Sequence, residues 1–70
     1  MSDHGSWAHR QRMAWIKETV EIFGFINREH LMKKFAISKP QASTDLKYFM
    51  THTSPPLIRY DASAKRYVKI

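Results

Sequence analysis

One stretch in the second half of the chain limits the possible fold more than any other, because it marks the start of a short helix. Ser38 is a good N-cap, and Gln41 stands three residues later at capping-box spacing. Pro40 is tolerated in a first helical turn, where the N–H that proline lacks has no intrahelical partner. An apolar stripe follows at helical spacing, formed by Ala42, Leu46 and Phe49. These signals predict a helix over residues 39–52 that buries one face.

The opposite face of this predicted helix is polar and lacks acidic side chains, whereas a plain surface helix usually carries some. It is formed by Lys39, Gln41, Ser43, Thr44 and Lys47. The one acid of the stretch is Asp45, beside the apolar stripe, where we expect it to fix a nearby cation such as Arg28 or a lysine, or to orient the helix. A helix face of this kind suits contact with a polyanion.

Length and composition limit the chain to one small domain. Seventy residues leave room for a single core, and 43% hydrophobic residues are enough to form one. The sequence has no cysteine, which excludes disulfides, and no apolar run near the roughly 20 residues that span a bilayer. The polar N-terminus lacks the apolar segment of a signal peptide. We therefore expect a cytoplasmic protein, with residues 1–6 as a mobile tail and residues 7–70 as the domain.

Positive charge is concentrated in the second half of the chain. Basic and acidic residues balance over residues 1–30, so the whole net charge of +6 falls on residues 31–70. Nucleic acid or an anionic membrane would suit such a field. A membrane-binding helix needs bulky apolar residues beside its basic ones, however, and residues 38–52 do not have that pattern. Nucleic acid is therefore the favoured partner, and a membrane is not expected.

A long helix is predicted over residues 7–23, with Gly24 as the residue that ends it. One apolar stripe contains Met13, Ile16, Val20 and Phe23, and a second stripe contains Trp15, Thr19 and Ile22. Together they cover nearly half of the helix, more than one packing neighbour requires. Deep burial in a small core is the simpler interpretation. The alternative is a dimer or partner face that includes Trp7, Trp15 and Ile22.

A second helix is predicted over residues 28–36, capped by Asn27, with a bridging strand at Phe25-Ile26 before it. Its inward-facing residues are Leu31, Met32 and Phe35. The short connection from this helix to the next has the spacing of a helix-turn-helix.

The last part of the chain reads as a β-hairpin over residues 57–60 and 66–70, because both segments are rich in β-branched and aromatic residues. Leu57 and Val68 are expected to face the core. The predicted fold is therefore α+β but mostly helical: a three-helix winged helix-turn-helix with a C-terminal two-stranded β-hairpin wing.

On such a fold the third helix enters the major groove of double-stranded DNA with its N-terminal half nearest the bases. We expect base contacts from Lys39, Gln41, Ser43 and Thr44. Gln41 cannot easily cap its own helix and read a base at once, and base reading is the interpretation we favour. Contacts to phosphates or to the minor groove are expected from Arg28, Ser38, Lys47, Tyr48, Lys65 and Arg66. Simple solvation is the alternative for these side chains.

The predicted third helix and wing contain three runs of residues that are more specific than a winged helix-turn-helix pattern alone requires. They are Ile37-Ser38-Lys39-Pro40-Gln41-Ala42-Ser43-Thr44-Asp45-Leu46, Ile58-Arg59-Tyr60-Asp61 and Arg66-Tyr67-Val68. These runs resemble the N-terminal winged helix of WYL-domain transcriptional regulators, including those associated with phage-defence loci, and they are similar to DeoR-type repressors. The resemblance extends from Ala14 to Val68. It implies a nucleoid-associated bacterial regulator, most simply a repressor.

The resemblance has two departures. Ala36 stands where the family often has glycine, and no WYL sensing domain follows Ile70. The chain is therefore either a DNA-binding fragment of a longer regulator or a small stand-alone repressor. Because one winged helix reads few base pairs, a homodimer on an inverted-repeat operator is expected.

Metal binding and catalysis are not expected. The four histidines, His4, His9, His30 and His52, have no metal-ligand spacing. The sequence has no nucleophile–base pair, no paired carboxylates in an apolar setting and no glycine-rich phosphate loop, so we expect no enzyme, cofactor or small-molecule substrate. The competing hypothesis is a protein-interaction winged helix that docks through the Trp7/Trp15 face of its first helix.

Overall fold

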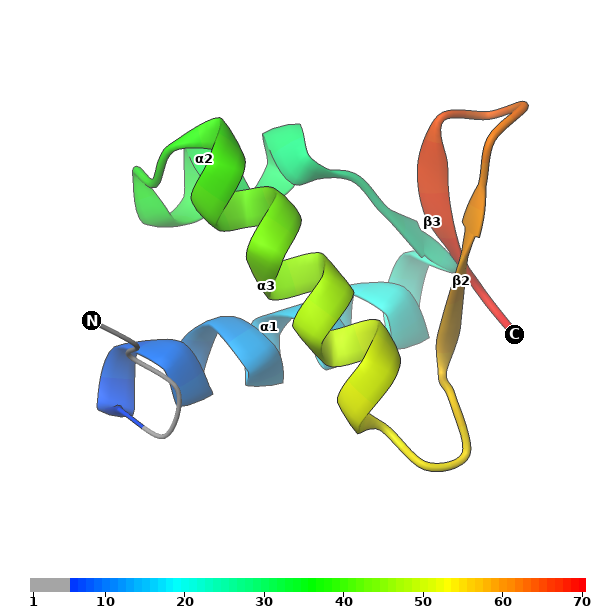
Figure 1. The fold of residues 1–70 in the computed structure, drawn as a ribbon, viewed down its shortest axis with the longest axis horizontal. Helices are drawn as coiled ribbons and strands as arrows, with labels where there is room; N and C mark the ends of the chain where they lie inside the picture. Colours follow the sequence, from blue (N-terminus) through cyan, green and yellow to red (C-terminus); the bar gives the residue numbers. More distant parts are fainter. Residues whose placement is uncertain (1–5) are drawn as a thin grey trace.

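The computed structural model describes residues 6–70, which form three helices and a three-stranded sheet (Figure 1). In chain order the elements are α1 (Trp7–Phe23), β1 (Phe25–Ile26), α2 (Arg28–Phe35), α3 (Lys39–His52), β2 (Ile58–Asp61) and β3 (Arg66–Lys69). Figure 1 shows α3 lying across α1, with α2 near the start of α3 and the sheet at the opposite end of the molecule. The predicted winged helix-turn-helix of the mostly helical α+β class is confirmed. Within the described residues, no helix is long and apolar enough to cross a membrane.

Local hydrogen bonds explain where α1 begins and ends. The Ser6 hydroxyl accepts a hydrogen bond from the backbone N–H of His9 at 3.1 Å, so Ser6 is the N-cap and not part of a tail. Gly24 has a φ of 82°, and its N–H donates to the carbonyl oxygen of Val20 at 2.8 Å. Both ends of the helix agree with the prediction. The rest of the predicted tail, residues 1–5, lies outside the described residues.

Two further caps fix the helix-turn-helix pair. Asn27 and His30 form a capping box, in which the Asn27 side chain accepts from the His30 N–H at 3.1 Å and His30 Nδ1 accepts from the Asn27 N–H at 3.2 Å. Ala36 has a φ of 54°, so α2 ends one residue earlier than predicted. Ser38 caps α3 as predicted, because its hydroxyl accepts from the N–H of Gln41 at 3.3 Å.

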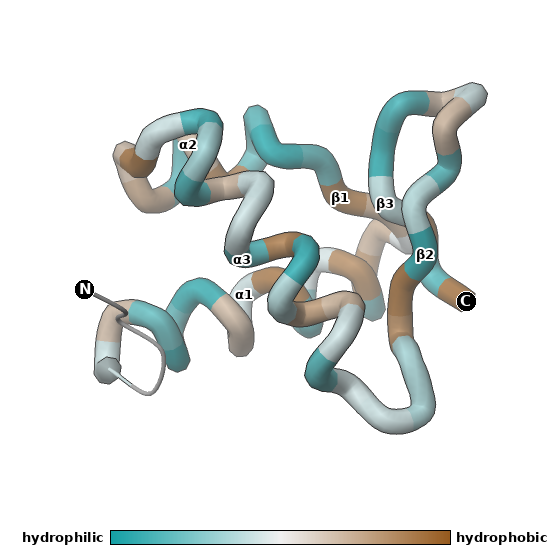
Figure 2. Tube along the Cα trace, viewed as in Figure 1, coloured by the Kyte–Doolittle hydropathy of each residue, from teal (hydrophilic) through white to brown (hydrophobic). Residues whose placement is uncertain are grey.

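The core lies where the three helices meet the sheet. Eight apolar side chains are buried there: Ile16, Val20, Ile26, Leu31, Ala42, Leu46, Phe49 and Ile58. Figure 2 shows hydrophobic segments recurring along α1 and α3 and concentrated at β1 and the start of β2. A large aliphatic side chain buried this completely contributes about 1.5–3 kcal/mol to folding. The apolar stripe predicted for α3 is confirmed.

The sheet has the order β1-β3-β2, and both pairings are antiparallel. Phe25 lies opposite Val68 and Ile26 lies opposite Tyr67, so the predicted bridging strand is confirmed. The wing is therefore not an isolated hairpin. Its second strand is held from the other side by the segment that joins α1 to α2.

The predicted facing of the hairpin residues was wrong by one position. Ile58 is 1% exposed and belongs to the core, whereas Leu57 is 38% exposed. On β3 it is Tyr67 that packs against the core, rather than Val68. Because successive side chains of a strand point to opposite faces, a shift of one residue exchanges the two faces.

The predicted burial of the whole apolar arc of α1 was also wrong in part. Ile16 and Val20 are buried, but Ile22 and Phe23 are 64% and 67% exposed. The last turn of α1 points these two side chains away from the core, so both apolar stripes are covered up to Thr19 and Val20 and exposed beyond them.

Candidate nucleic-acid interface

The predicted base-reading side of α3 is accessible. Lys39, Thr44 and Lys47 are exposed, and Gln41 and Ser43 are half-buried. The cap at Ser38 leaves that serine exposed at the start of the same helix, with its hydroxyl accepting the Gln41 N–H.

The acid of α3 forms a buried ion pair with α1. Asp45 is fully buried, and its Oδ2 lies 2.6 Å from Nε of Arg12, while its Oδ1 lies 3.3 Å from Nη2 of the same arginine. Oδ1 also accepts a hydrogen bond from Nε2 of Gln41 at 2.9 Å. The expected cation partner, Arg28 or a lysine, was therefore wrong, and the partner is Arg12. The sequence offered one indication that Arg12 is buried, because Arg12 stands one helical turn before Ile16 and therefore on the same face of α1.

Two aromatic contacts also involve α3. The rings of Tyr48 and His52 are stacked with centroids 3.8 Å apart, and the ring of His9 meets that of Tyr48 edge-on at 4.8 Å. His9, in the first turns of α1, is itself buried. Tyr48, predicted to contact a phosphate or simply to pack, therefore makes packing contacts with both histidines. Among the described residues, no group of three or more histidine, aspartate or glutamate side chains is placed to hold a metal ion.

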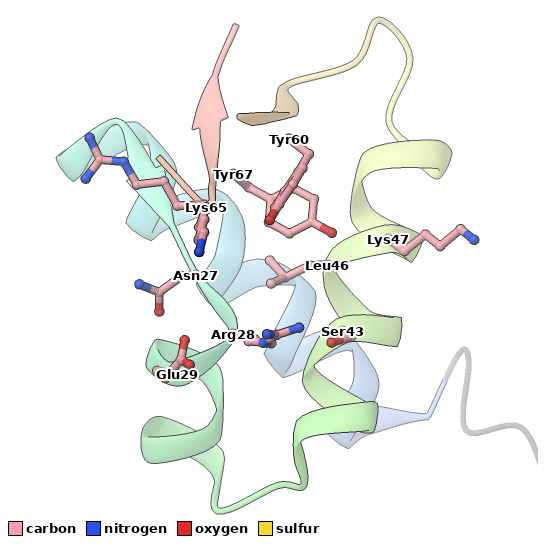
Figure 3. Close-up of a pocket in the computed structure, with 10 residues that line it drawn as sticks. Asn27, Arg28, Glu29, Ser43, Leu46, Lys47, Tyr60, Lys65 and Tyr67 are labelled. Carbon is pink, nitrogen blue, oxygen red and sulfur yellow. The ribbon is translucent and has the colours of Figure 1, made fainter. Parts of the chain in front are cut away.

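A cleft of about 460 Å³ opens between the start of α2, the middle of α3 and the wing (Figure 3). Its lining residues are Asn27, Arg28, Glu29, Ser43, Leu46, Lys47, Tyr60, Lys65, Arg66 and Tyr67. Each of the three elements contributes a cationic side chain: Arg28 from α2, Lys47 from α3 and Lys65 from the wing. Figure 3 shows Lys65 pointing into this space and Lys47 extending outward from α3. The cleft thus joins segments that are far apart in the sequence into one positively charged surface.

Five of the predicted DNA-contacting residues line this cleft, and the other five lie elsewhere. Arg28, Ser43, Lys47, Lys65 and Arg66 line it. The residues that do not are Ser38, Lys39, Thr44 and Tyr48. Gln41 is not a lining residue either, because its amide is turned to Asp45.

Two tyrosines that sequence reasoning missed form the floor of the cleft on the wing side. Tyr60 and Tyr67 face each other across β2 and β3, with ring centroids 5.0 Å apart at an angle of 63°. Burial raises the pKa of the Tyr67 hydroxyl, the neighbouring Tyr60 raises it further, and Arg28 lowers it in part. The sequence did indicate one tyrosine in each strand of the hairpin. Placing Tyr60 opposite Tyr67, however, required the correct register of the two strands.

The predicted partner face on α1 is only partly open. Trp7 is 69% exposed, whereas Trp15 is half-buried and packs edge-on against Phe35 with ring centroids 5.6 Å apart. A second, mostly apolar cleft of about 550 Å³ lies beside Trp15. It is lined by Trp15, Thr19, Phe23, Phe25, His30, Lys33 and Lys34.

Comparison with known proteins identifies the family of this domain. A family model of the BrxR transcriptional regulator winged helix-turn-helix domain matches residues 8–70. The chain belongs to this family. Within the BrxR-type domain, the match extends from the first turn of α1 to the end of the wing. The predicted winged helix-turn-helix of a transcriptional regulator is thereby confirmed.

Two curated Escherichia coli proteins, one of them from strain KTE188, are similar to this BrxR-type domain. Both are described as the DNA-binding transcriptional repressor CapW, and each is 38% identical over 61 residues. The aligned region covers 87% of this chain but 20% of each relative. The chain therefore spans about a fifth of the length of the curated relatives that it matches.

Proposed function

We propose that this BrxR-type domain binds double-stranded DNA in a sequence-dependent manner and acts in transcriptional repression. The observation that carries the proposal is the cleft at which α2, α3 and the wing each place a cation beside the accessible side of α3. A duplex presents two features to such a surface, a major groove that accepts a helix and two phosphate chains that border it. The similarity to the repressor CapW supports the same conclusion.

In this proposal α3 lies in the major groove and reads bases with its first two turns. Gln41 pairs with adenine through N6 and N7, and Lys39 reaches O6 and N7 of guanine. Ser43 and Thr44 donate or accept hydrogen bonds, and the Thr44 methyl group contacts a thymine methyl group. The exposed positions of Lys39 and Thr44 and the half-buried positions of Gln41 and Ser43, on one side of α3, support these roles.

The phosphate chain would follow the cleft from α2 to the wing. Arg28, Lys47 and Lys65 neutralise successive phosphates, and the half-exposed Tyr60 offers its hydroxyl beside them. The wing loop, centred on residues 61–66, contacts phosphates or the minor groove.

Binding to random-sequence duplex DNA at several salt concentrations tests this proposal. The logarithm of the binding constant should fall with the logarithm of salt concentration, with a slope of about 0.9 per phosphate contact. Each of the variants Arg28→Ala, Lys47→Ala and Lys65→Ala should reduce that slope by about one unit. The matched control is Lys17→Ala, which removes an exposed cation of α1 outside the cleft and should leave the slope unchanged. Absence of duplex binding at low salt, or equal effects of all four variants, would contradict the proposal.

We also propose that two copies act together on an inverted-repeat operator in the bacterial cytoplasm, in association with the nucleoid. One winged helix contacts too few base pairs for specificity among genomic sites. The exposed apolar side chains on α1, Trp7, Ile22 and Phe23, support a contact between copies through this helix. Sedimentation of the chain with a duplex that holds two half-sites should give two chains per duplex, and Ile22→Glu should reduce this to one. The competing proposal is that a different protein binds α1 through Trp7 and Trp15. It requires the wild-type and Ile22→Glu chains to bind the duplex with the same stoichiometry.

A further inference from the structure

We infer that Arg12 and Asp45 are positioning residues that orient the Gln41 side-chain amide, and thereby make this domain discriminate adenine from guanine at one base pair. The inference rests on the proposed DNA-binding function. It concerns two residues that have no part in the surface offered to DNA, because Asp45 is fully buried and Arg12 is 6% exposed.

The ion pair determines which end of the Gln41 amide can face inward. Asp45 accepts hydrogen bonds from Arg12 at both of its oxygens, at 2.6 and 3.3 Å, which is the arrangement of an ionised carboxylate. An ionised carboxylate has no proton to donate. The group of Gln41 that lies 2.9 Å from Oδ1 is therefore the amide nitrogen, and a flipped amide would place two acceptor oxygens against each other.

This orientation decides what Gln41 retains for a base. One of the two amide hydrogens is donated to Asp45, so the amide retains one N–H and the oxygen Oε1. Adenine offers the complementary pair in the major groove, an acceptor at N7 and a donor at N6. Guanine offers two acceptors, N7 and O6, and satisfying both would require both amide hydrogens.

The buried pair thus determines which base Gln41 prefers, without contacting a base. A Gln41 side chain released from Asp45 can turn its whole NH₂ group towards guanine. It can equally present one N–H and Oε1 to adenine, so discrimination is lost while adenine binding remains. A merely structural pair would instead change binding to all sequences by the same factor.

Selection from a random-sequence duplex library tests this inference with the 70-residue chain. Comparison of the wild type with Gln41→Ala first identifies the base pair that Gln41 reads. At that pair the wild type should prefer adenine to guanine by about tenfold, the value typical of a good bidentate contact. Asp45→Asn, whose amide can accept or donate, should reduce this preference to roughly threefold or less and leave the other positions unchanged.

A second variant covers the case in which the single substitution prevents folding. Arg12→Met combined with Asp45→Asn removes both buried charges together, so no uncompensated arginine remains in the interior. It should lose the same adenine preference, and thermal unfolding should show that it is folded. Glu21→Gln is the charge-matched control, because it removes one exposed acid of α1 and should retain the wild-type preference.

The outcomes separate the inference from the function on which it rests. Failure of the wild type to bind any duplex at low salt would overturn the proposed function. Duplex binding with an adenine preference that both folded variants retain would overturn only the positioning role. A preference for guanine at the base pair identified by Gln41→Ala would also overturn it.

Discussion

The guanidinium carbon of Arg66 lies 4.2 Å from the centre of the Phe25 ring, so the first residue of β3 is stacked on the first residue of β1. Arg66 was predicted from the sequence to contact DNA, and it does line the charged cleft. Its stacked, half-buried position also holds the wing to β1, the segment that joins α1 to α2.

Arg66→Ala should therefore lower the free energy of unfolding, and its effect on the free energy of DNA binding should be smaller. A cation–π contact of this kind is worth about 0.5–2 kcal/mol, and the free energy of unfolding should fall by a value in that range. Lys65→Ala, at the exposed neighbouring position, should leave stability unchanged and reduce the salt dependence of duplex binding. Urea unfolding and duplex titration of both variants would check this, and a larger loss of stability for Lys65→Ala would contradict it.

The register of the wing can be tested with two adjacent aliphatic residues. Ile58→Ala removes a side chain that is 1% exposed and should destabilise the domain by about 2–5 kcal/mol. Leu57→Ala removes a side chain that is 38% exposed, and the cost should be several-fold smaller. The measurement is the urea midpoint of each variant. The opposite ranking would restore the facing that the sequence predicted.

Ala36 has a backbone conformation that glycine adopts with less strain, since its φ is 54° and its ψ is 44°. The left-handed region costs a residue with a Cβ about 1–2 kcal/mol, and the greater freedom of glycine in the unfolded chain offsets about 0.4–1 kcal/mol of this. Ala36→Gly should therefore stabilise the domain slightly and raise the melting temperature. The matched control Ala14→Gly, at an exposed position inside α1, should destabilise by about 1 kcal/mol. Equal losses for both variants would show that the strain at Ala36 is negligible.

Stability at alkaline pH should depend on Tyr67. Burial and the neighbouring Tyr60 raise its pKa above the ordinary value of 10.0, so the folded chain holds the phenolic proton more tightly than the unfolded chain does. This contribution to stability is complete below about pH 10 and is lost as the pH rises through the folded-state pKa. The melting temperature of the wild type should therefore fall more steeply between about pH 9 and pH 11 than that of Tyr67→Phe. Parallel curves for the two proteins would contradict this origin.

The helix boundaries could be predicted because their signals are local. Ser38, Asn27 and Gly24 each act on backbone groups within a few residues, and each does in the structure what its residue type favours. The resemblance to known regulators and the charge distribution were likewise sufficient to identify the face of α3 and the wing as the candidate interface.

The missed features all depend on contacts between distant segments. Arg12 and Asp45 come from different helices, and their pairing is set by how α1 crosses α3, which no local pattern records. The facing of Leu57 and Ile58 was ambiguous because both are aliphatic, and their burial is decided by pairing with β3. The cleft itself could not be predicted, since it exists only after the wing is placed beside α2.

The middle strand of the sheet is the last strand in the sequence, and this determines when the domain can become stable during synthesis. β1 and β2 do not pair with each other, and each of them pairs with β3. On a translating ribosome the helices can form as they emerge, but β1 remains without a partner while α2, α3 and β2 are made. Completion of the last strand therefore closes the sheet and the charged cleft in the same step, so the nascent chain acquires this positively charged cleft only when the whole domain has left the ribosome.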